Sequence, residues 1–112
     1  MRIEINKDHK TVVLIPMEKT IDAALSQELR EALVNVIKDG AASLVLDLSH
    51  VQFMDSSGLG AMVSALKVMG NAGDMVLCGV QESVMSVLSL TRLDRVFRIY
   101  TGADDACEAV AG

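Results

Sequence analysis

The feature that most limits the possible folds is a short apolar run, Ser43 to Leu48, between residues that break regular structure. Leu44, Val45 and Leu46 follow one another with no polar residue between them, which is typical of a strand buried on both faces. Segments with apolar residues at helical spacing precede and follow this run. Their apolar residues are Leu25, Leu29, Leu33 and Val36 in the first segment and Leu59, Met62, Val63, Leu66 and Met69 in the second. A strand buried between amphipathic helices predicts an α/β fold whose sheet is mostly parallel.

Two β-rich segments near the N-terminus predict a hairpin. The segment 2–6 alternates in polarity, the segment 11–15 is rich in β-branched residues, and the polar stretch 7–10 lies between them. Asp22 is a good N-cap for the helix that follows, and Gly40 is expected to end that helix.

The rest of the chain continues the alternation of strands and helices. Further strands are expected over 75–78 and 96–100, with a short helix near 82–91 and another helix at the C-terminus. The residues expected to face inward in that last helix are Ala106, Ala109 and Val110. The predicted order is ββαβαβαβα. We therefore expect an N-terminal hairpin leading into a mostly parallel, four- to five-stranded sheet with about four helices packed on it.

Length and composition indicate a single domain over 1–112. The chain has 112 residues, of which 51% are hydrophobic and 3% aromatic, so a core of aliphatic side chains is expected. The formal net charge is −5 and the basic residues are scattered, which argues against nucleic acid as a partner. No apolar run approaches the roughly 20 residues that span a bilayer. The N-terminus lacks a signal-peptide pattern, so we expect no membrane insertion, a cytoplasmic location, and free thiols at Cys78 and Cys107.

The segment Asp55-Ser56-Ser57-Gly58-Leu59-Gly60 is the main candidate for a functional site. It places an acid and two hydroxyls where a helix begins, so that backbone N–H groups are unpaired and the helix dipole is positive. A Ser or Asp at such a place usually caps the helix, which contributes about 1 kcal/mol. A phosphate on a serine would also be favourable there, because it brings a charge of about −1.5 to −2 beside N–H donors, although Asp55 would oppose it. The residues alone leave both roles open.

Other kinds of active site lack the residues that they need. A serine hydrolase would carry Gly-x-Ser-x-Gly, which is absent, although His50 lies shortly before Ser56 and is a conceivable base. A receiver domain would carry an acidic pair after its first strand, and the chain has none, so Asp47 is expected to bond loop amides instead. Gly58-x-Gly60 is a fragment of a nucleotide-binding loop with no Walker lysine, and no His or Cys pair has metal-ligand spacing. We therefore expect no enzymatic activity, no cofactor and no metal.

The same region resembles a known family. The run Leu44 to Ser49, followed by Val51 to Gly60 with its Asp-Ser-Ser-Gly-Leu-Gly ending, is similar to the STAS domain, and in particular to single-domain anti-sigma factor antagonists. Ile21-Asp22, Gly73 to Cys78 and Leu93 to Phe97 also resemble family segments. The resemblance extends over nearly the whole chain and implies the STAS fold.

What the resemblance implies about function centres on Ser56. In the family, the first hydroxyl after the Asp accepts a phosphoryl group from an anti-sigma factor, a serine kinase of the histidine-kinase-like ATPase fold, and a PP2C-type phosphatase removes it. The unphosphorylated protein binds this partner and the phosphorylated protein is released, which regulates transcription or a related signalling output. The implied partner-binding positions are Asp22, Asp55, Ser57, Gly58, Leu59 and Gly60.

One position departs from the family pattern. Many relatives have a glycine three residues before the position of Asp22, and this chain has Lys19 there, within the expected docking turn. The resemblance also leaves an alternative function, since other STAS domains are non-phosphorylated scaffold modules associated with transporters or lipid-trafficking complexes. In such a module Ser56 would only cap the helix.

Overall fold

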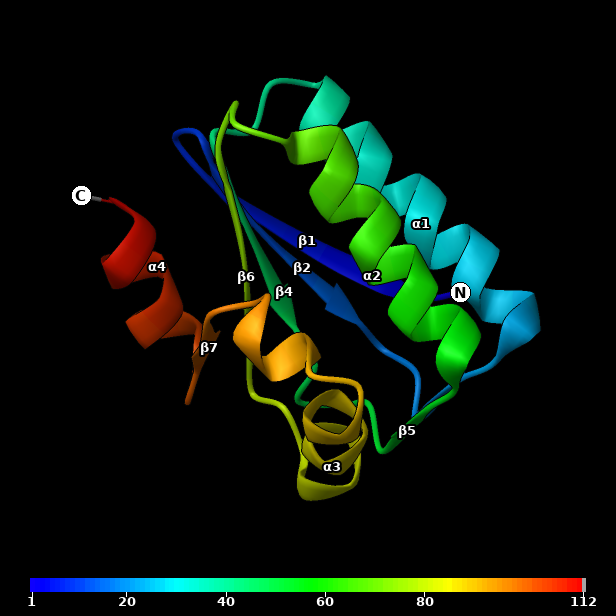
Figure 1. Ribbon diagram of the computed structural model, residues 1–112. Helices are drawn as coiled ribbons and strands as arrows, with labels where there is room; N and C mark the ends of the chain where they lie inside the picture. Colours follow the sequence, from blue (N-terminus) through cyan, green and yellow to red (C-terminus); the bar gives the residue numbers. More distant parts are fainter. Residues whose placement is uncertain (112) are drawn as a thin grey trace.

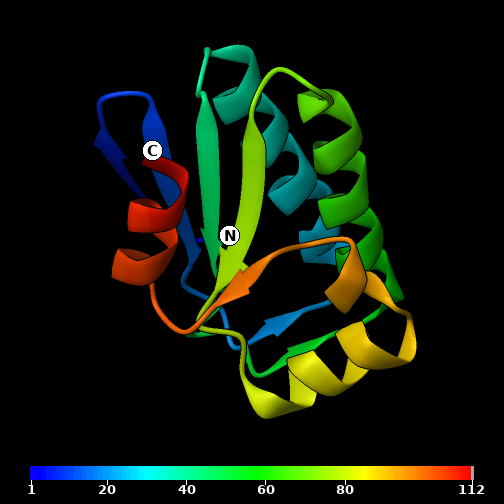
Figure 2. The same ribbon diagram turned by 60° about the vertical axis from the view of Figure 1, so that its left-hand side comes forward.

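The computed structural model describes residues 1–111 and shows a central sheet with helices on both faces (Figures 1 and 2). The strands are β1 (Ile3–Asp8), β2 (Thr11–Pro16), β3 (Thr20–Ile21), β4 (Ser43–Asp47), β5 (Phe53–Met54), β6 (Asp74–Cys78) and β7 (Ile99–Tyr100). The helices are α1 (Ala23–Lys38), α2 (Ser56–Met69), α3 (Glu82–Leu90), the 3-10 helix η1 (Leu93–Arg95) and α4 (Ala103–Ala111). The predicted α/β fold, with its N-terminal hairpin and its helices packed on the sheet, is confirmed.

Five strands form the main sheet, in the order β1-β2-β4-β6-β7. β1 pairs antiparallel with β2, whereas β2, β4, β6 and β7 run parallel to one another. The hairpin turn consists of His9 and Lys10, so both strands are longer than expected. Parallel neighbours need crossover connections, and α1 and α2 supply them from β2 to β4 and from β4 to β6.

The two faces of the sheet are covered by different helices. α1 and α2 lie side by side over one face, as both views show (Figures 1 and 2). Fully buried side chains of this main core include Leu14, Leu29, Leu33, Leu44, Leu46, Met62 and Leu77. α4 lies on the other face, where Val45, Val76, Cys78 and Ala106 form a smaller core. The run Leu44 to Leu46 therefore contributes to both cores, which explains why it has no polar alternation.

The structure corrects the expected C-terminal region. Val96 and Phe97 do not belong to the last strand, because η1 and a turn precede β7, and the amide of Phe97 donates to the carbonyl of Leu93 at 3.0 Å. Ala109 is exposed, contrary to expectation, whereas Ala106 is buried as expected. The inner side of α4 is instead formed by Ala103, Ala106, Cys107 and Val110, which recur at three- and four-residue spacing and leave Ala109 outside that row.

Candidate functional site

Two short parallel strands place the starts of α1 and α2 next to each other. β3 pairs with β5, with Ile21 opposite Met54. The amide of Asp55 then donates to the carbonyl oxygen of Ile21 at 3.3 Å. Asp22 and Asp55 follow these strands directly and are the N-caps of α1 and α2. The structure therefore brings together the two acidic positions of the expected site, at the neighbouring beginnings of the two helices (Figure 1).

The N-cap of α2 is Asp55, and its Oδ1 atom accepts three hydrogen bonds. The donors are the amide of Ser57 at 3.0 Å, the amide of Gly58 at 3.3 Å and the hydroxyl of Ser57 at 2.5 Å. Asp22 caps α1 in a similar way and accepts two backbone amides at 3.1 and 3.2 Å. Ser57 thus supports the cap of α2 through both its backbone and its side chain.

These bonds lower the pKa of Asp55 from its ordinary value of 3.8. The hydroxyl of Ser57 is the largest cause, desolvation acts in the opposite direction, and the amides of Gly58 and Ser57 add to the lowering. Each donor favours the charged carboxylate over the neutral acid. Asp55 therefore keeps a negative charge beside Ser56 at neutral pH and well into the acidic range.

Ser56 is the first residue of α2, and its side chain is exposed. Within residues 1–111 its hydroxyl makes no hydrogen bond, whereas the hydroxyl of Ser57 is bound to Asp55. The two neighbouring serines therefore differ in what they can do. A phosphate on Ser56 would lie near the N–H groups of the helix start, but also near a carboxylate of like charge.

The two glycines of the loop have different surroundings. Gly58 is buried, and a Cβ atom there would overlap Cγ of Met54 and approach Cγ2 of Ile21 to 3.4 Å. Gly60 is exposed, and nothing lies within 4 Å of its Cβ position. Leu59 is also buried, at 5% exposure. Gly58 and Leu59 thus pack against the protein itself, and their expected part in partner binding stays a prediction.

The residues that reach the surface here form what we call the helix-start surface: Asp22, Phe53, Asp55, Ser56 and Gly60. Phe53 is 53% exposed and was not predicted to belong to it. An aromatic ring left in solvent between charged and polar groups is typical of a recognition surface. The only hint in the sequence that Phe53 belongs to the site is its position two residues before the cap. Its exposure could not be predicted, because it depends on the pairing of β5 with β3 in a separate two-stranded sheet.

Lys19 lies at the edge of the helix-start surface. Its carbonyl oxygen accepts the amides of Gln52 at 2.7 Å and Phe53 at 3.0 Å, so its backbone is part of the connection between the two short strands. Its φ is not positive, so a residue other than glycine fits without backbone strain. The exposed side chain of Lys19 lines a hollow of about 290 Å³, together with His50. The departure from the family pattern therefore changes the surface and leaves the fold of the turn intact.

The alternative chemistries considered from the sequence can be compared with this geometry. In the described part of the chain, no hydrogen bond joins His50 to Ser56 or Ser57, and Asp47 accepts the amide of Ser49 at 2.9 Å, as expected for a carboxylate that holds a loop. Among residues 1–111 no three His, Cys, Asp or Glu side chains are arranged to hold a metal ion. None of the described helices is long and apolar enough to cross a membrane.

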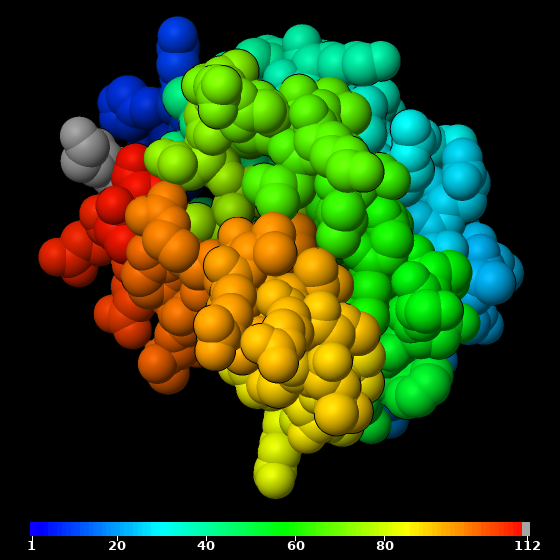
Figure 3. Space-filling model, viewed as in Figure 1, coloured from blue at the N-terminus to red at the C-terminus, as the bar shows by residue number. Residues whose placement is uncertain are grey.

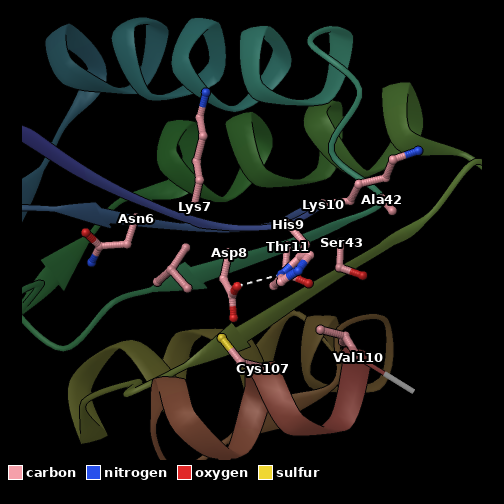
Figure 4. A pocket seen from close by; sticks show the side chains of 11 residues that line it. Asn6, Lys7, Asp8, His9, Lys10, Thr11, Ala42, Ser43, Cys107 and Val110 are labelled. Carbon is pink, nitrogen blue, oxygen red and sulfur yellow. Dashed lines mark hydrogen bonds and ion pairs between the residues drawn. The ribbon is translucent and has the colours of Figure 1, made fainter.

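A larger cavity lies at the opposite end of the sheet. It has a volume of about 440 Å³ and lies between the β1–β2 turn and α4 (Figure 4). Asp8 Oδ1 and His9 Nδ1 are 2.7 Å apart in its wall, and Cys107 and Val110 point toward the hairpin from α4. This cavity shares no residue with the helix-start surface. A search for the functional site by cavity size would therefore lead to a different part of the molecule than the chemistry of the Asp-Ser-Ser-Gly loop does.

Known proteins resemble this chain over nearly its full length. Residues 2–106 match the family model of the STAS domain. An anti-sigma-F factor antagonist of Mycobacterium tuberculosis is 29% identical over 105 residues, which cover 94% of this chain and 86% of that protein. An anti-sigma F factor antagonist of Paenibacillus polymyxa is 29% identical over 103 residues, covering 89% and 88%. The crystal structure of an anti-sigma factor antagonist from Mycobacterium paratuberculosis has a TM-score of 0.91 at 26% identity, covering 99% and 94%. The chain therefore belongs to the STAS domain family.

Proposed function

We propose that the protein is a partner-switching regulator whose binding is controlled by phosphorylation of Ser56. The unphosphorylated protein binds an anti-sigma factor that is a serine kinase of the histidine-kinase-like ATPase fold. Phosphorylation releases this partner, and a PP2C-type phosphatase restores the binding form. The observation that carries the proposal is the exposed hydroxyl of Ser56 at the start of α2, which makes no hydrogen bond within residues 1–111, beside a Ser57 hydroxyl that is held by Asp55. The similarity to proteins named anti-sigma factor antagonists supports the choice of partner.

The mechanism follows from where the phosphate would lie. Because Asp55 and Ser57 hold the cap, modification of the Ser56 hydroxyl removes none of the hydrogen bonds seen in the described part of the chain. The helix dipole tolerates the new charge, while Asp22 and Asp55 oppose it, so the fold is kept and the surface becomes strongly negative. A partner bound over this surface would have to desolvate that charge. A loss of about 3 kcal/mol is enough to weaken binding roughly 100-fold.

Binding measurements on Ser56 variants test the switch. Each ATPase-fold anti-sigma factor encoded in the same genome is purified and titrated calorimetrically with wild type, Ser56→Ala and Ser56→Asp. We expect Ser56→Ala to bind as wild type does and Ser56→Asp to bind at least about 100-fold more weakly, because only the latter carries the charge. Asn35→Asp adds the same charge at an exposed position on α1 and should bind normally.

Phosphate-affinity electrophoresis after incubation with ATP and the bound anti-sigma factor identifies the acceptor. One shifted band is expected for wild type and for Ser57→Ala, and none for Ser56→Ala. A shift that persists in Ser56→Ala would place the acceptor at another residue. Normal binding by Ser56→Asp, together with an unshifted wild type, would favour the scaffold role in which Ser56 only helps to begin the helix.

A further inference from the structure

An exposed apolar and cationic patch lies where α3 ends and η1 begins. Leu90 is 84% exposed and Val96 is 53% exposed. Arg92 and Arg95 lie between them in the chain and are exposed, as is Asp94, so the segment carries two positive charges and one negative charge. We call Leu90, Arg92, Arg95 and Val96 the α3–η1 patch. A large aliphatic side chain with most of its surface in water, near guanidinium groups in the chain, has the composition of an interface residue and is a candidate contact for another molecule.

The backbone and the charges of the patch support that interpretation. Arg92 has φ +62° and ψ +18°, a left-handed conformation in which glycine is favoured after a helix and any side chain adds strain. Arg98, further along, pairs with Asp74 at 3.2 Å. Within residues 1–111 neither Arg92 nor Arg95 has an ion-pair partner. Two unpaired guanidinium groups, one of them at a strained position, are therefore available to a negatively charged surface.

The patch is continuous with the helix-start surface through α3. The hydroxyl of Ser83, in the first turn of α3, donates to the carbonyl of Gln52, which directly precedes β5. Leu90, the last residue of α3, follows Ser83 by seven positions, so at about 1.5 Å per residue it lies only about 10 Å along the helix from that anchor. A standard interface covers roughly 800 Å² on each partner and can include both places. Figure 3 shows α2, α3 and η1 as neighbouring parts of one face of the molecule.

The two ends of this combined face carry opposite charges. The helix-start surface has the carboxylates of Asp22 and Asp55, and at the patch the guanidinium groups of Arg92 and Arg95 outnumber the carboxylate of Asp94. Such an arrangement fixes the orientation in which a partner docks, because the reversed orientation places like charges against each other. The cationic end is also unusual for a chain with a net charge of −5.

We infer that the α3–η1 patch is a second contact surface for the anti-sigma factor that binds the helix-start surface, and that it engages an acidic region of that partner with an apolar pocket for Leu90. The inference rests on the proposed function for the identity of the partner. It adds that the partner touches two separate places, of which only one carries the phosphorylation site.

Paired variants test the patch against the anti-sigma factor that binds wild type. Leu90→Ser should weaken binding about tenfold at any salt concentration, because it removes an apolar anchor. Arg95→Glu should weaken binding about tenfold or more at about 50 mM salt and less at about 300 mM, because salt screens exposed charges. Val68→Ser, at an apolar position of α2 that is 42% exposed, and Arg30→Glu, at an exposed position of α1, are the matched controls and should bind as wild type does.

Arg92→Gly separates binding from folding. Glycine relieves the left-handed strain, so the unfolding midpoint should stay equal to or above that of wild type while binding falls several-fold. Arg92→Lys keeps the charge and should recover most of the affinity.

The outcomes separate this inference from the proposed function. If Leu90→Ser and Arg95→Glu bind the anti-sigma factor as wild type does, and Ser56→Asp does not bind it, the second contact is overturned and the proposed phosphorylation switch is retained. Weakened patch variants together with a normally binding Ser56→Asp would retain the second contact and overturn the switch. If no anti-sigma factor binds wild type, both are overturned.

Discussion

At the start of α2, neighbouring residues have separate roles: Asp55 and Ser57 hold the helix cap, and Ser56 presents its hydroxyl to solvent. The carboxylate of Asp55 and the hydroxyl of Ser57 form an internal pair, while the side chain of Ser56 faces solvent without a bond in the described chain. Removing the cap would therefore cost stability, whereas modifying Ser56 would change the surface. The two kinds of effect can be measured separately.

Replacement of Ser57 by Ala should raise the pKa of Asp55 toward 3.8, because it removes the largest cause of the lowering. The folded-state pKa of Asp55 lies below its unfolded value, so its contribution to stability is present above about pH 3.8 and is lost as the pH falls through the folded value. Ser57→Ala reduces the difference between the folded-state and unfolded-state pKa values of Asp55. On acidification, the Ser57→Ala protein should therefore begin to unfold at a higher pH than wild type. Carboxyl ¹³C NMR titration of Asp55 measures the shift directly.

A serine further along the same helix is the control for this prediction. Ser64 is partly buried further along α2 and is not among the groups that shift the pKa of Asp55, so Ser64→Ala should leave the titration of Asp55 unchanged. If Asp55 titrates identically in wild type and Ser57→Ala, the hydroxyl does not hold the carboxylate.

Several of these residue roles could be predicted from the sequence. Asp22 as a cap and Asp47 as a loop acceptor follow from local chemistry, since short polar side chains bond the nearest backbone amides. The burial of Gly58 and the exposure of Phe53 could not be predicted, because both depend on which segment β5 pairs with. Burial is set by contacts distant in the sequence, and local patterns do not contain them.

At the scale of elements, α2 contains two glycines, Gly58 and Gly60. The sequence pattern does not distinguish them, but their surroundings in the structure differ. Gly60→Ala should stabilise the protein by up to about 1 kcal/mol, because alanine favours the helix and nothing lies within 4 Å of the new atom. Gly58→Ala should destabilise it by about 1 to 3 kcal/mol, because the new atom overlaps the side chain of Met54. Urea unfolding of both variants gives the two free energies.

The same pair tests the expected approach of a partner to this helix. If Gly60 permits close backbone contact, Gly60→Ala should bind the anti-sigma factor more weakly although it is more stable. A Gly58→Ala protein as stable as wild type would show that the packing of β5 on α2 relaxes freely, and would contradict the structural role assigned to Gly58.

The long elements were predictable and the short ones were not. α1 and α2 each present enough residues for a hydrophobic period to appear, with a cap or a glycine at an end, and β4 is recognisable as an unbroken apolar run. β3, β5 and β7 have two residues each, and η1 has three, too few to show a period. The pairing of β3 with β5 nevertheless brings Asp22 and Asp55 close together, so the strands that assemble the site are among those that pattern analysis misses.

For the whole molecule, the second face of the sheet is protected by α4. Cys78 is fully buried beneath it, and burial, with smaller effects of Asp47 and Cys107, raises the pKa of its thiol to about 12. Burial also raises the pKa of Cys107, with contributions from Asp104 and Asp8, but this thiol is only partly covered. The reactivity of the two thiols therefore reports how well α4 is docked.

In the native protein at about pH 8, a disulfide reagent such as Ellman's reagent should modify Cys107 slowly and leave Cys78 unmodified. Cys107→Ser should then show no native reactivity and one reactive thiol after denaturation. Fast modification of the native Cys107→Ser protein would mean that α4 leaves the sheet readily.

In alkali the pH dependence of stability has the opposite sign, because there the raised pKa belongs to Cys78. The unfolded chain releases the Cys78 proton near its ordinary pKa of 9.0, while the folded chain holds it to about 12, so stability should fall as the pH rises above about 9. A Cys78→Ala variant should lose less stability over the same range.

The separation of the Ser56 side chain from the bonds that begin α2 has a consequence for how such a protein can diversify. The bonds that hold the helix start are made by Asp55 and Ser57, so mutations of the Ser56 or Lys19 side chain act on selection mainly through binding and little through folding. After a gene duplication, two copies could acquire different partners by changes at these outer positions alone. Insulated pathways could therefore arise from one ancestral scaffold without passing through unstable intermediates.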